Sequence, residues 1–150
     1  MKSISIIRTA LLFGFICMSL AVSAQRNPVT WEGQAEKLSA DTYRLNITAA
    51  IKSGWYVYAQ KLESDMGPVP TSLEFDDVET IGETIESGNR KEGMDKAFGM
   101  NVVKYLENVT FSQEVKVPVG ASEVKCTVSF MTCNGEMCLP PKSVEVLVML

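Results

Sequence analysis

The sequence predicts an all-β protein in which two antiparallel sheets pack face to face. Apolar and polar residues alternate along several short segments, which is the period of a strand with one buried side. Glycine, proline and aspartate separate these segments, and no long segment has the spacing of an amphipathic helix. Short strands divided by such turn residues are typical of an antiparallel β-sandwich.

The alternation places the strands along the chain. It is strictest at residues 43–51, where the odd-numbered residues are all apolar. It recurs at residues 109–117, 124–130 and 144–150, and shorter segments between them fit strands as well. In chain order the predicted strands are residues 30–35, 43–51, 55–60, 71–75, 78–85, 109–117, 124–130 and 144–150.

Two segments interrupt this pattern. Residues 86–100 are mostly polar and contain three glycines and one aromatic residue, Phe98, which predicts a long surface loop. Long loops in compact domains are often functional, although a tolerated surface excursion fits the same composition. Residues 65–72 include Pro68 and Pro70, which hold this segment in an extended or turning conformation.

The first 24 residues have the pattern of a secretory signal peptide. Lys2 and Arg8 precede an apolar run at residues 10–22, and small residues allow cleavage after Ala24. The run is shorter than the ~20 apolar residues that a membrane-spanning helix requires. We therefore expect a periplasmic or secreted protein whose residues 25–150 form one domain.

Charge and composition exclude several classes of function. The formal net charge of −4 at pH 7 argues against nucleic acid or an anionic membrane as a partner. The chain has no histidine, so it lacks the commonest metal ligand and the commonest general base. A zinc site would need cysteines and carboxylates alone. We therefore expect neither a metal nor any other cofactor.

Strand parity separates the cysteines. Cys17 is lost with the signal peptide, and Cys126 alternates with valines and a phenylalanine, so it should point into the core. Cys133 has the opposite parity at the end of its strand. It is followed by Asn134-Gly135, which favours a tight turn of positive φ, and Cys138 begins the returning segment. Cys133 and Cys138 are therefore the predicted disulfide pair.

The short spacing of this pair favours redox work over stabilisation. Closing so small a loop stabilises a fold by only about 2 kcal/mol in the chain-entropy model. A disulfide at an exposed hairpin end is open to in-line attack by a partner thiolate. A purely structural bond in a secreted binding module remains the alternative.

The cysteine motif belongs to a set that resembles a known family. The segments GWYVYAQ, GPVPTS and KAFGM precede TCNGEMCLPP in this order, and together they resemble the N-terminal periplasmic domain of the thiol:disulfide interchange protein DsbD. The resemblance covers residues 31–150. It implies an immunoglobulin-like β-sandwich whose cysteine pair takes electrons from a membrane-embedded domain. That pair passes them to periplasmic thioredoxin-like proteins through mixed disulfides, which makes the chain a thiol-disulfide oxidoreductase.

The resemblance also implies roles for individual residues. Cys133 and Cys138 match the redox pair, and residues 95–99 match a cap loop over it, with Phe98 as an aromatic lid. The positions that match neighbours of the pair are Tyr56, Tyr58 and Asp95. The tyrosines could equally be half-buried strand residues, and Phe98 a loop anchor.

Two departures from the family affect the expectations. The loop between the cysteines is one residue shorter than in the enterobacterial form, and the sequence ends at Leu150 without a membrane domain. We therefore expect a monomer that receives electrons from a separate membrane thiol reductase. Glu136 lies between the cysteines and no histidine is present, so we expect thiol pKa values of roughly 8.5 or above.

Overall fold

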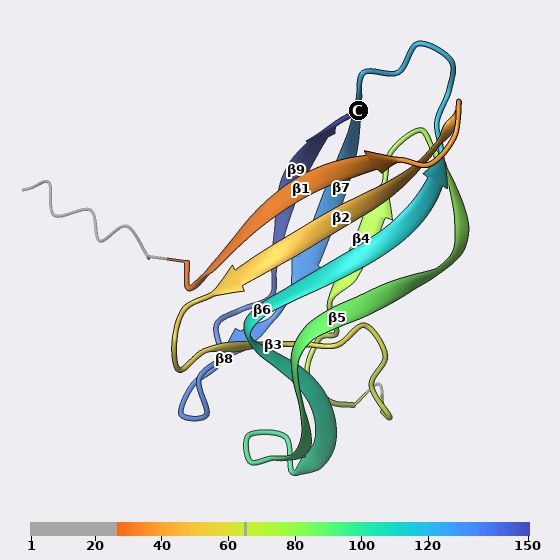
Figure 1. The fold of residues 1–150 in the computed structure, drawn as a ribbon. Coiled ribbons are helices and arrows are strands. Elements are labelled where there is room, and N and C mark those ends of the chain that lie inside the picture. Colours follow the sequence, from red (N-terminus) through yellow and green to blue (C-terminus); the bar gives the residue numbers. More distant parts are fainter. Residues whose placement is uncertain (1–26, 65) are drawn as a thin grey trace, which may run out of the picture.

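The computed structural model describes residues 27–64 and 66–150, and their regular structure is entirely β-strand (Figure 1). This confirms the predicted all-β, immunoglobulin-like sandwich. The predicted signal peptide, with Cys17, lies outside the described residues. Within residues 27–64 and 66–150, no helix is long and apolar enough to cross a membrane.

The strands are β1 (Val29–Lys37), β2 (Thr42–Ile51), β3 (Tyr56–Tyr58), β4 (Ser72–Phe75), β5 (Glu79–Asp95), β6 (Met100–Lys116), β7 (Glu123–Phe130), β8 (Thr132–Cys133) and β9 (Lys142–Met149).

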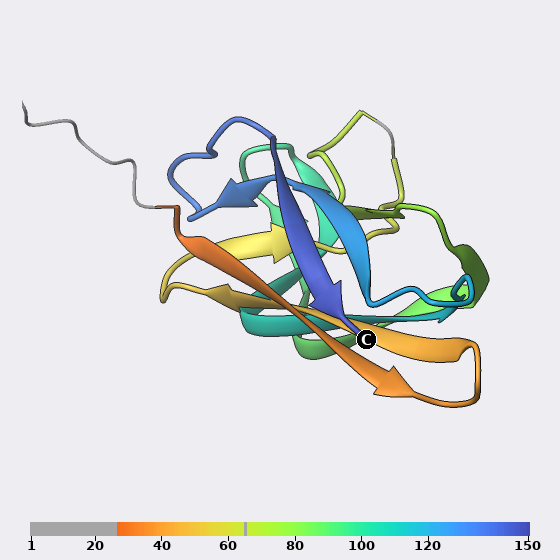
Figure 2. The same cartoon turned by 90° about the horizontal axis from the view of Figure 1, so that it is seen from above.

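The strands form a six-stranded sheet and a three-stranded sheet. The larger sheet has the order β1-β2-β6-β3-β8, with β5 also paired to β6, and the smaller has the order β4-β7-β9. Strand β5 pairs with β6 over almost its whole length, so β2 and β3 share the other edge of β6. Figure 2 shows the blue strands β7 and β9 lying over the larger sheet. Strand β6 is therefore the centre of the larger sheet.

The main core fills the space between the two sheets. Alternate residues of β2, β6, β7 and β9 point into it and are almost fully buried, as the alternation of the sequence predicts. Cys126 lies among them with 0% of its surface exposed. The largest completely buried apolar side chains of this core are Leu45, Ile47, Phe111 and Phe130.

A bulge bends the β5–β6 pair near its middle. The register passes from Gly88 opposite Val109 to Asn89 opposite Leu106, which leaves Glu107 and Asn108 of β6 without cross-strand partners in β5. Glu107 has a φ of 62°, in the left-handed region. Beyond this bend the β5–β6 hairpin continues past β3 and β8 toward its own tip (Figure 1).

The prediction of a loop at residues 86–100 is wrong. These residues belong to β5 and the start of β6, and only residues 96–99 form the connecting turn. Strand β5 is an edge strand that includes most of the predicted strand at residues 78–85. Its continuation at residues 86–95 has mostly exposed side chains, so the sequence there carries no apolar alternation. Its backbone pairing with β6 holds it in the sheet instead. Strand β3 is also shorter than the predicted strand at residues 55–60.

The bulge requires glycine at position 88, and this can be tested. A Cβ on Gly88 would lie 2.8 Å from Val109 Cα and closer still to the Asn108 carbonyl oxygen. Gly88→Ala should therefore lower the free energy of unfolding by about 1–3 kcal/mol in denaturant titrations. Gly93→Ala is the matched control on the same strand, because a Cβ there would meet no described atom within 4 Å. Equal effects of the two substitutions would contradict the close packing at the bulge.

Candidate functional site

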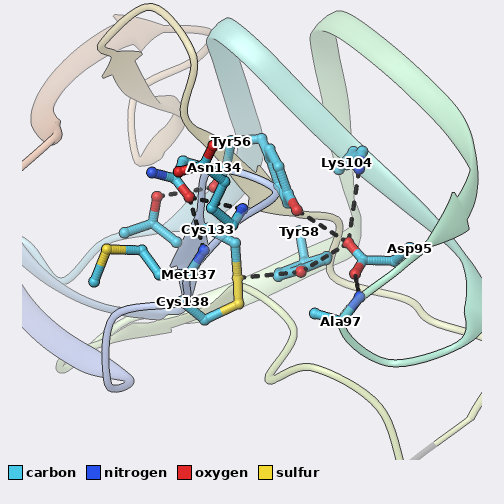
Figure 3. Close-up of a disulfide and its surroundings, with 11 residues drawn as sticks. Tyr56, Tyr58, Asp95, Ala97, Lys104, Cys133, Asn134, Met137 and Cys138 are labelled. Atoms are coloured by element: carbon cyan, nitrogen blue, oxygen red, sulfur yellow. Dashed lines mark hydrogen bonds and ion pairs between the residues drawn. A yellow bond between two sulfur atoms is a disulfide. The ribbon is translucent and has the colours of Figure 1, made fainter.

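The predicted disulfide is present. Cys133 and Cys138 are bonded, with their Cα atoms 4.1 Å apart, and Figure 3 shows the bond with its surroundings. Of the three cysteines that the structure describes, Cys126 is the free one, and it is buried. Burial, followed by the charge of Asp76, raises the pKa of the Cys126 thiol to about 12. The predicted separation of Cys126 from the pair is therefore confirmed.

The segment between the cysteines is a tight turn held by Asn134. The Asn134 N–H donates to the Met137 carbonyl oxygen at 3.0 Å. The Asn134 side-chain oxygen accepts from the N–H groups of Glu136 at 3.0 Å and Met137 at 2.8 Å. The prediction of positive φ holds for Gly135, at 87°, but Asn134 does not share that conformation. Asn134 contributes through its side chain, in the manner of an Asx-turn.

The two bonded cysteines differ in exposure. Cys133 has 0% of its surface exposed, whereas Cys138 is partly exposed. The expectation of an exposed disulfide is therefore correct for one cysteine only. Cys133 lies in strand β8, which pairs with Tyr56 and Val57 of β3, and this pairing encloses it. The enclosing residues form a second apolar cluster on the face of the larger sheet that points away from the main core.

Strand β3 supplies two hydroxyl groups to this cluster. Tyr56 and Tyr58 point to the same side, and their hydroxyls donate to Asp95 Oδ2 at 3.2 Å and 3.1 Å. The Tyr58 hydroxyl also lies 3.3 Å from Cys133 Sγ. Burial, together with the neighbouring Asp95, raises the pKa of both tyrosines, so both hydroxyls keep their hydrogen.

Two threonines fix the position of β3. Thr71 Oγ1 donates to the Tyr58 carbonyl oxygen at 2.6 Å, and Thr132 Oγ1 donates to the Tyr56 carbonyl oxygen at 2.8 Å. Both threonines are buried. Buried hydroxyls that find a carbonyl partner add specificity to the packing of a short strand. The tyrosine side chains are therefore held in place from both sides of β3.

Asp95 ends β5 and is almost completely buried, with 1% of its surface exposed. Its Oδ1 accepts the Ala97 N–H at 2.9 Å, and its carbonyl oxygen accepts the Gly99 N–H at 2.8 Å, which closes the turn. Burial alone would raise the pKa of Asp95. The Ala97 N–H, the Tyr58 hydroxyl and the charge of Lys104 outweigh that effect and lower the pKa below its ordinary value.

Lys104 is the fourth polar residue of the site, beside Tyr56, Tyr58 and Asp95. The sequence did not predict it. Its Nζ lies 3.6 Å from Asp95 Oδ2 and 4.0 Å from the centre of the Tyr56 ring, with 22% of its side chain exposed. Its signal in the sequence is weak. Met100, Val102 and Leu106 alternate with it on the same face of β6, and Lys104 is the charged residue in this apolar row.

Of the other predicted site residues, Phe98 contacts the residues around Asp95 and Glu136 does not. The Phe98 ring meets the Tyr58 ring edge-on, with centroids 6.3 Å apart, and Phe98 is partly buried against the second cluster. Glu136 is exposed, and among the described interactions only its backbone N–H takes part in the turn. Within the described part of the chain, no group of three or more His, Cys, Asp or Glu side chains is placed to hold a metal ion.

Residues 26–150 match the family model described as thiol:disulfide interchange protein DsbD, N-terminal. The chain belongs to the DsbD N-terminal domain family. No curated protein sequence matches the chain.

Solved structures of related domains share the fold. The DsbD N-terminal domain of Neisseria meningitidis in the reduced form has a TM-score of 0.54 and 18% identity, over 80% of this chain and 85% of that one. The N-terminal periplasmic domain of ScsB from Proteus mirabilis has a TM-score of 0.53 and 18% identity, over 78% of this chain and 44% of that one. The complex between the DsbD and PilB N-terminal domains of Neisseria meningitidis matches with a TM-score of 0.51 and 17% identity, over 78% of this chain and 79% of that one.

The buried carboxylate makes the stability of this DsbD-type domain depend on pH. The pKa of folded Asp95 lies below its ordinary value of 3.8, so its contribution is full above about pH 4 and is lost as the pH falls through the folded pKa. At pH 7, Asp95→Asn should lower the free energy of unfolding by about 1–3 kcal/mol, because charge-assisted hydrogen bonds are lost. The difference from the wild type should shrink in denaturant titrations at pH 3.

A suitable control for this prediction is Asp77→Asn. Asp77 is exposed, and asparagine also adopts its left-handed φ of 55°. The control should change the free energy of unfolding by less than about 0.5 kcal/mol at either pH. A difference between Asp95→Asn and the wild type that stays constant down to pH 3 would contradict an ionised Asp95 in the folded domain.

Proposed function

We propose that this domain relays electrons by thiol-disulfide exchange between a membrane thiol reductase and thioredoxin-like periplasmic proteins, with Cys133 and Cys138 as the redox pair. The observation that carries the proposal is the one-sided exposure of the bond. A partner can reach Cys138, whereas Cys133 is enclosed. Membership of the DsbD N-terminal family supports the same reading.

The exposure assigns different roles to the two sulfurs. A partner thiolate attacks Cys138 Sγ, the bond between Cys133 and Cys138 breaks, and its electron pair leaves with Cys133 as a thiolate. The second partner thiolate then attacks the partner sulfur of the mixed disulfide and releases Cys138. The partner dithiol has become a disulfide, the domain has gained two electrons, and its thiolates take protons from water. The reverse sequence passes the electrons on.

The residues around Cys133 fit the role of a leaving sulfur. The Tyr58 hydroxyl, 3.3 Å from Cys133 Sγ, can donate to the thiolate as it forms. Phe98 extends from the turn at residues 96–99, and its ring packs edge-on against the Tyr58 ring in the second cluster. We assign Phe98 the role of a cap. Glu136 remains a charged neighbour on the outer side of the turn.

The surface near the bond suits a protein partner. Met137, in the turn between the cysteines, is 54% exposed. Methionine side chains are flexible and polarizable, so they adapt to more than one partner surface. The Neisseria structure is a complex between a DsbD N-terminal domain and another protein domain, which supports docking of this kind.

Membership of the same family supports a proposal for the location of the domain. A periplasmic location agrees with the related ScsB domain, which is an N-terminal periplasmic domain. We propose cleavage of the signal peptide after Ala24 and a single domain at residues 25–150 that works as a monomer.

The enclosed position of Cys133 also favours a second candidate, a secreted binding module with a purely structural disulfide.

A pair of trapping variants separates the roles of the sulfurs. Cys133→Ser keeps the accessible Cys138 thiol, and Cys138→Ser keeps the enclosed Cys133 thiol. Each variant is mixed with a thioredoxin whose resolving cysteine has been replaced. The remaining thioredoxin cysteine carries an activated mixed disulfide. Cys133→Ser should capture thioredoxin at least about tenfold faster, because the attacking sulfur must approach in line. Equal capture, or faster capture by Cys138→Ser, would contradict the assignment.

A further inference from the structure

We propose that Lys104 is a positioning residue of the exchange reaction. It serves as the counterion of Asp95 and so allows the Tyr58 hydroxyl to turn from Asp95 to the Cys133 thiolate when the disulfide opens. This inference rests on the proposed function and adds to it a residue that determines how readily Cys133 leaves. In Figure 3 dashed lines connect Lys104 to Asp95, Asp95 to Tyr58, and Tyr58 to the disulfide.

The hydrogen of the Tyr58 hydroxyl has two possible acceptors. The Tyr58 oxygen lies 3.1 Å from Asp95 Oδ2 and 3.3 Å from Cys133 Sγ. A tyrosine hydroxyl carries a single hydrogen, so it serves one acceptor fully at a time. A disulfide sulfur is a weak acceptor and a carboxylate a strong one, so the hydrogen points to Asp95 while the bond is closed. A thiolate at Cys133 competes with Asp95 for it.

Asp95 keeps three other partners when the Tyr58 hydroxyl turns away. It keeps the Ala97 N–H at 2.9 Å, the Tyr56 hydroxyl at 3.2 Å and the Lys104 ammonium group at 3.6 Å. Only Lys104 brings a full positive charge. Without it, the carboxylate and the new thiolate would be two negative charges in a largely buried cluster, and each would disfavour the other.

The structure holds Lys104 in the position that a counterion of Asp95 requires. It lies directly opposite Tyr58 in the β3–β6 pairing, and its ammonium group stacks on the Tyr56 ring at 4.0 Å. With 22% of its side chain exposed, its charge is screened less than that of a surface lysine. Lys104 is therefore fixed relative to both tyrosines.

The remaining charged groups around the cluster are exposed to solvent. Lys91 of β5 pairs directly with Lys104, Lys96 is in the turn, and Glu136 is in the segment between the cysteines. All three are exposed, so water and salt weaken their effect on a charge at Cys133. Lys91 offers a matched control, since it is a lysine on the same face without the contact to Asp95.

The test measures exchange of the oxidised domain with reduced thioredoxin over a range of pH. Lys104→Met should slow the reaction on the order of threefold to tenfold at pH 7, because one charge near the leaving thiolate is lost. It should also shift the alkylation profile of the reduced thiols to higher pH. Lys104→Arg should restore both to within about twofold, because it restores the charge. Lys91→Met should behave as the wild type.

A double substitution distinguishes charge from packing. Asp95→Asn combined with Lys104→Met makes the cluster neutral again, so exchange should recover toward the wild-type rate although two native contacts are missing. Unchanged exchange and alkylation profiles in Lys104→Met would overturn the proposal. So would a Lys104→Arg or double variant as slow as Lys104→Met, because the loss would then come from packing. A wild-type domain that does not exchange at all would instead overturn the proposed function.

Discussion

The buried carboxylate of Asp95 is the interaction on which the site depends. It accepts hydrogen bonds from its own turn and from Tyr56 and Tyr58 of β3, and it pairs with Lys104 of β6. A carboxylate that is 1% exposed is tolerated only where such partners compensate for lost water. These partners in turn fix the hairpin tip against the strand that faces the disulfide. One charged group therefore links three separate parts of the chain to the redox pair.

The larger sheet is shaped to bring these parts together. The bulge at Gly88 and the left-handed Glu107 bend the β5–β6 hairpin, and the tip of the hairpin brings Asp95 to the tyrosines of β3. Strand β8 also pairs with β3, so Cys133 lies beside Tyr56. The site is thus on the outer face of a sheet whose inner face forms the main core. The fold can carry reactive groups there without disturbing its most stable part.

The sequence predicted the parts of this arrangement that follow from strand periodicity. Alternation identified the core strands, and parity separated the buried Cys126 from the bonded Cys133 and Cys138. It identified only the first half of β5, at residues 78–85, and missed residues 86–95, because an exposed edge strand is held by backbone pairing and needs no apolar face. It also missed Lys104 and the enclosure of Cys133, since both depend on contacts between strands far apart in the sequence.

We propose that the disulfide exchanges electrons with a docked protein through Cys138. The most direct measurement compares the rates at which a reduced thioredoxin-like protein and glutathione reduce the oxidised wild-type domain, at equal thiolate concentration. We expect the protein partner to react at least about a hundredfold faster, because docking positions its thiolate in line with Cys138. Equally slow reduction by both would show a structural disulfide and contradict a redox role for Cys133 and Cys138.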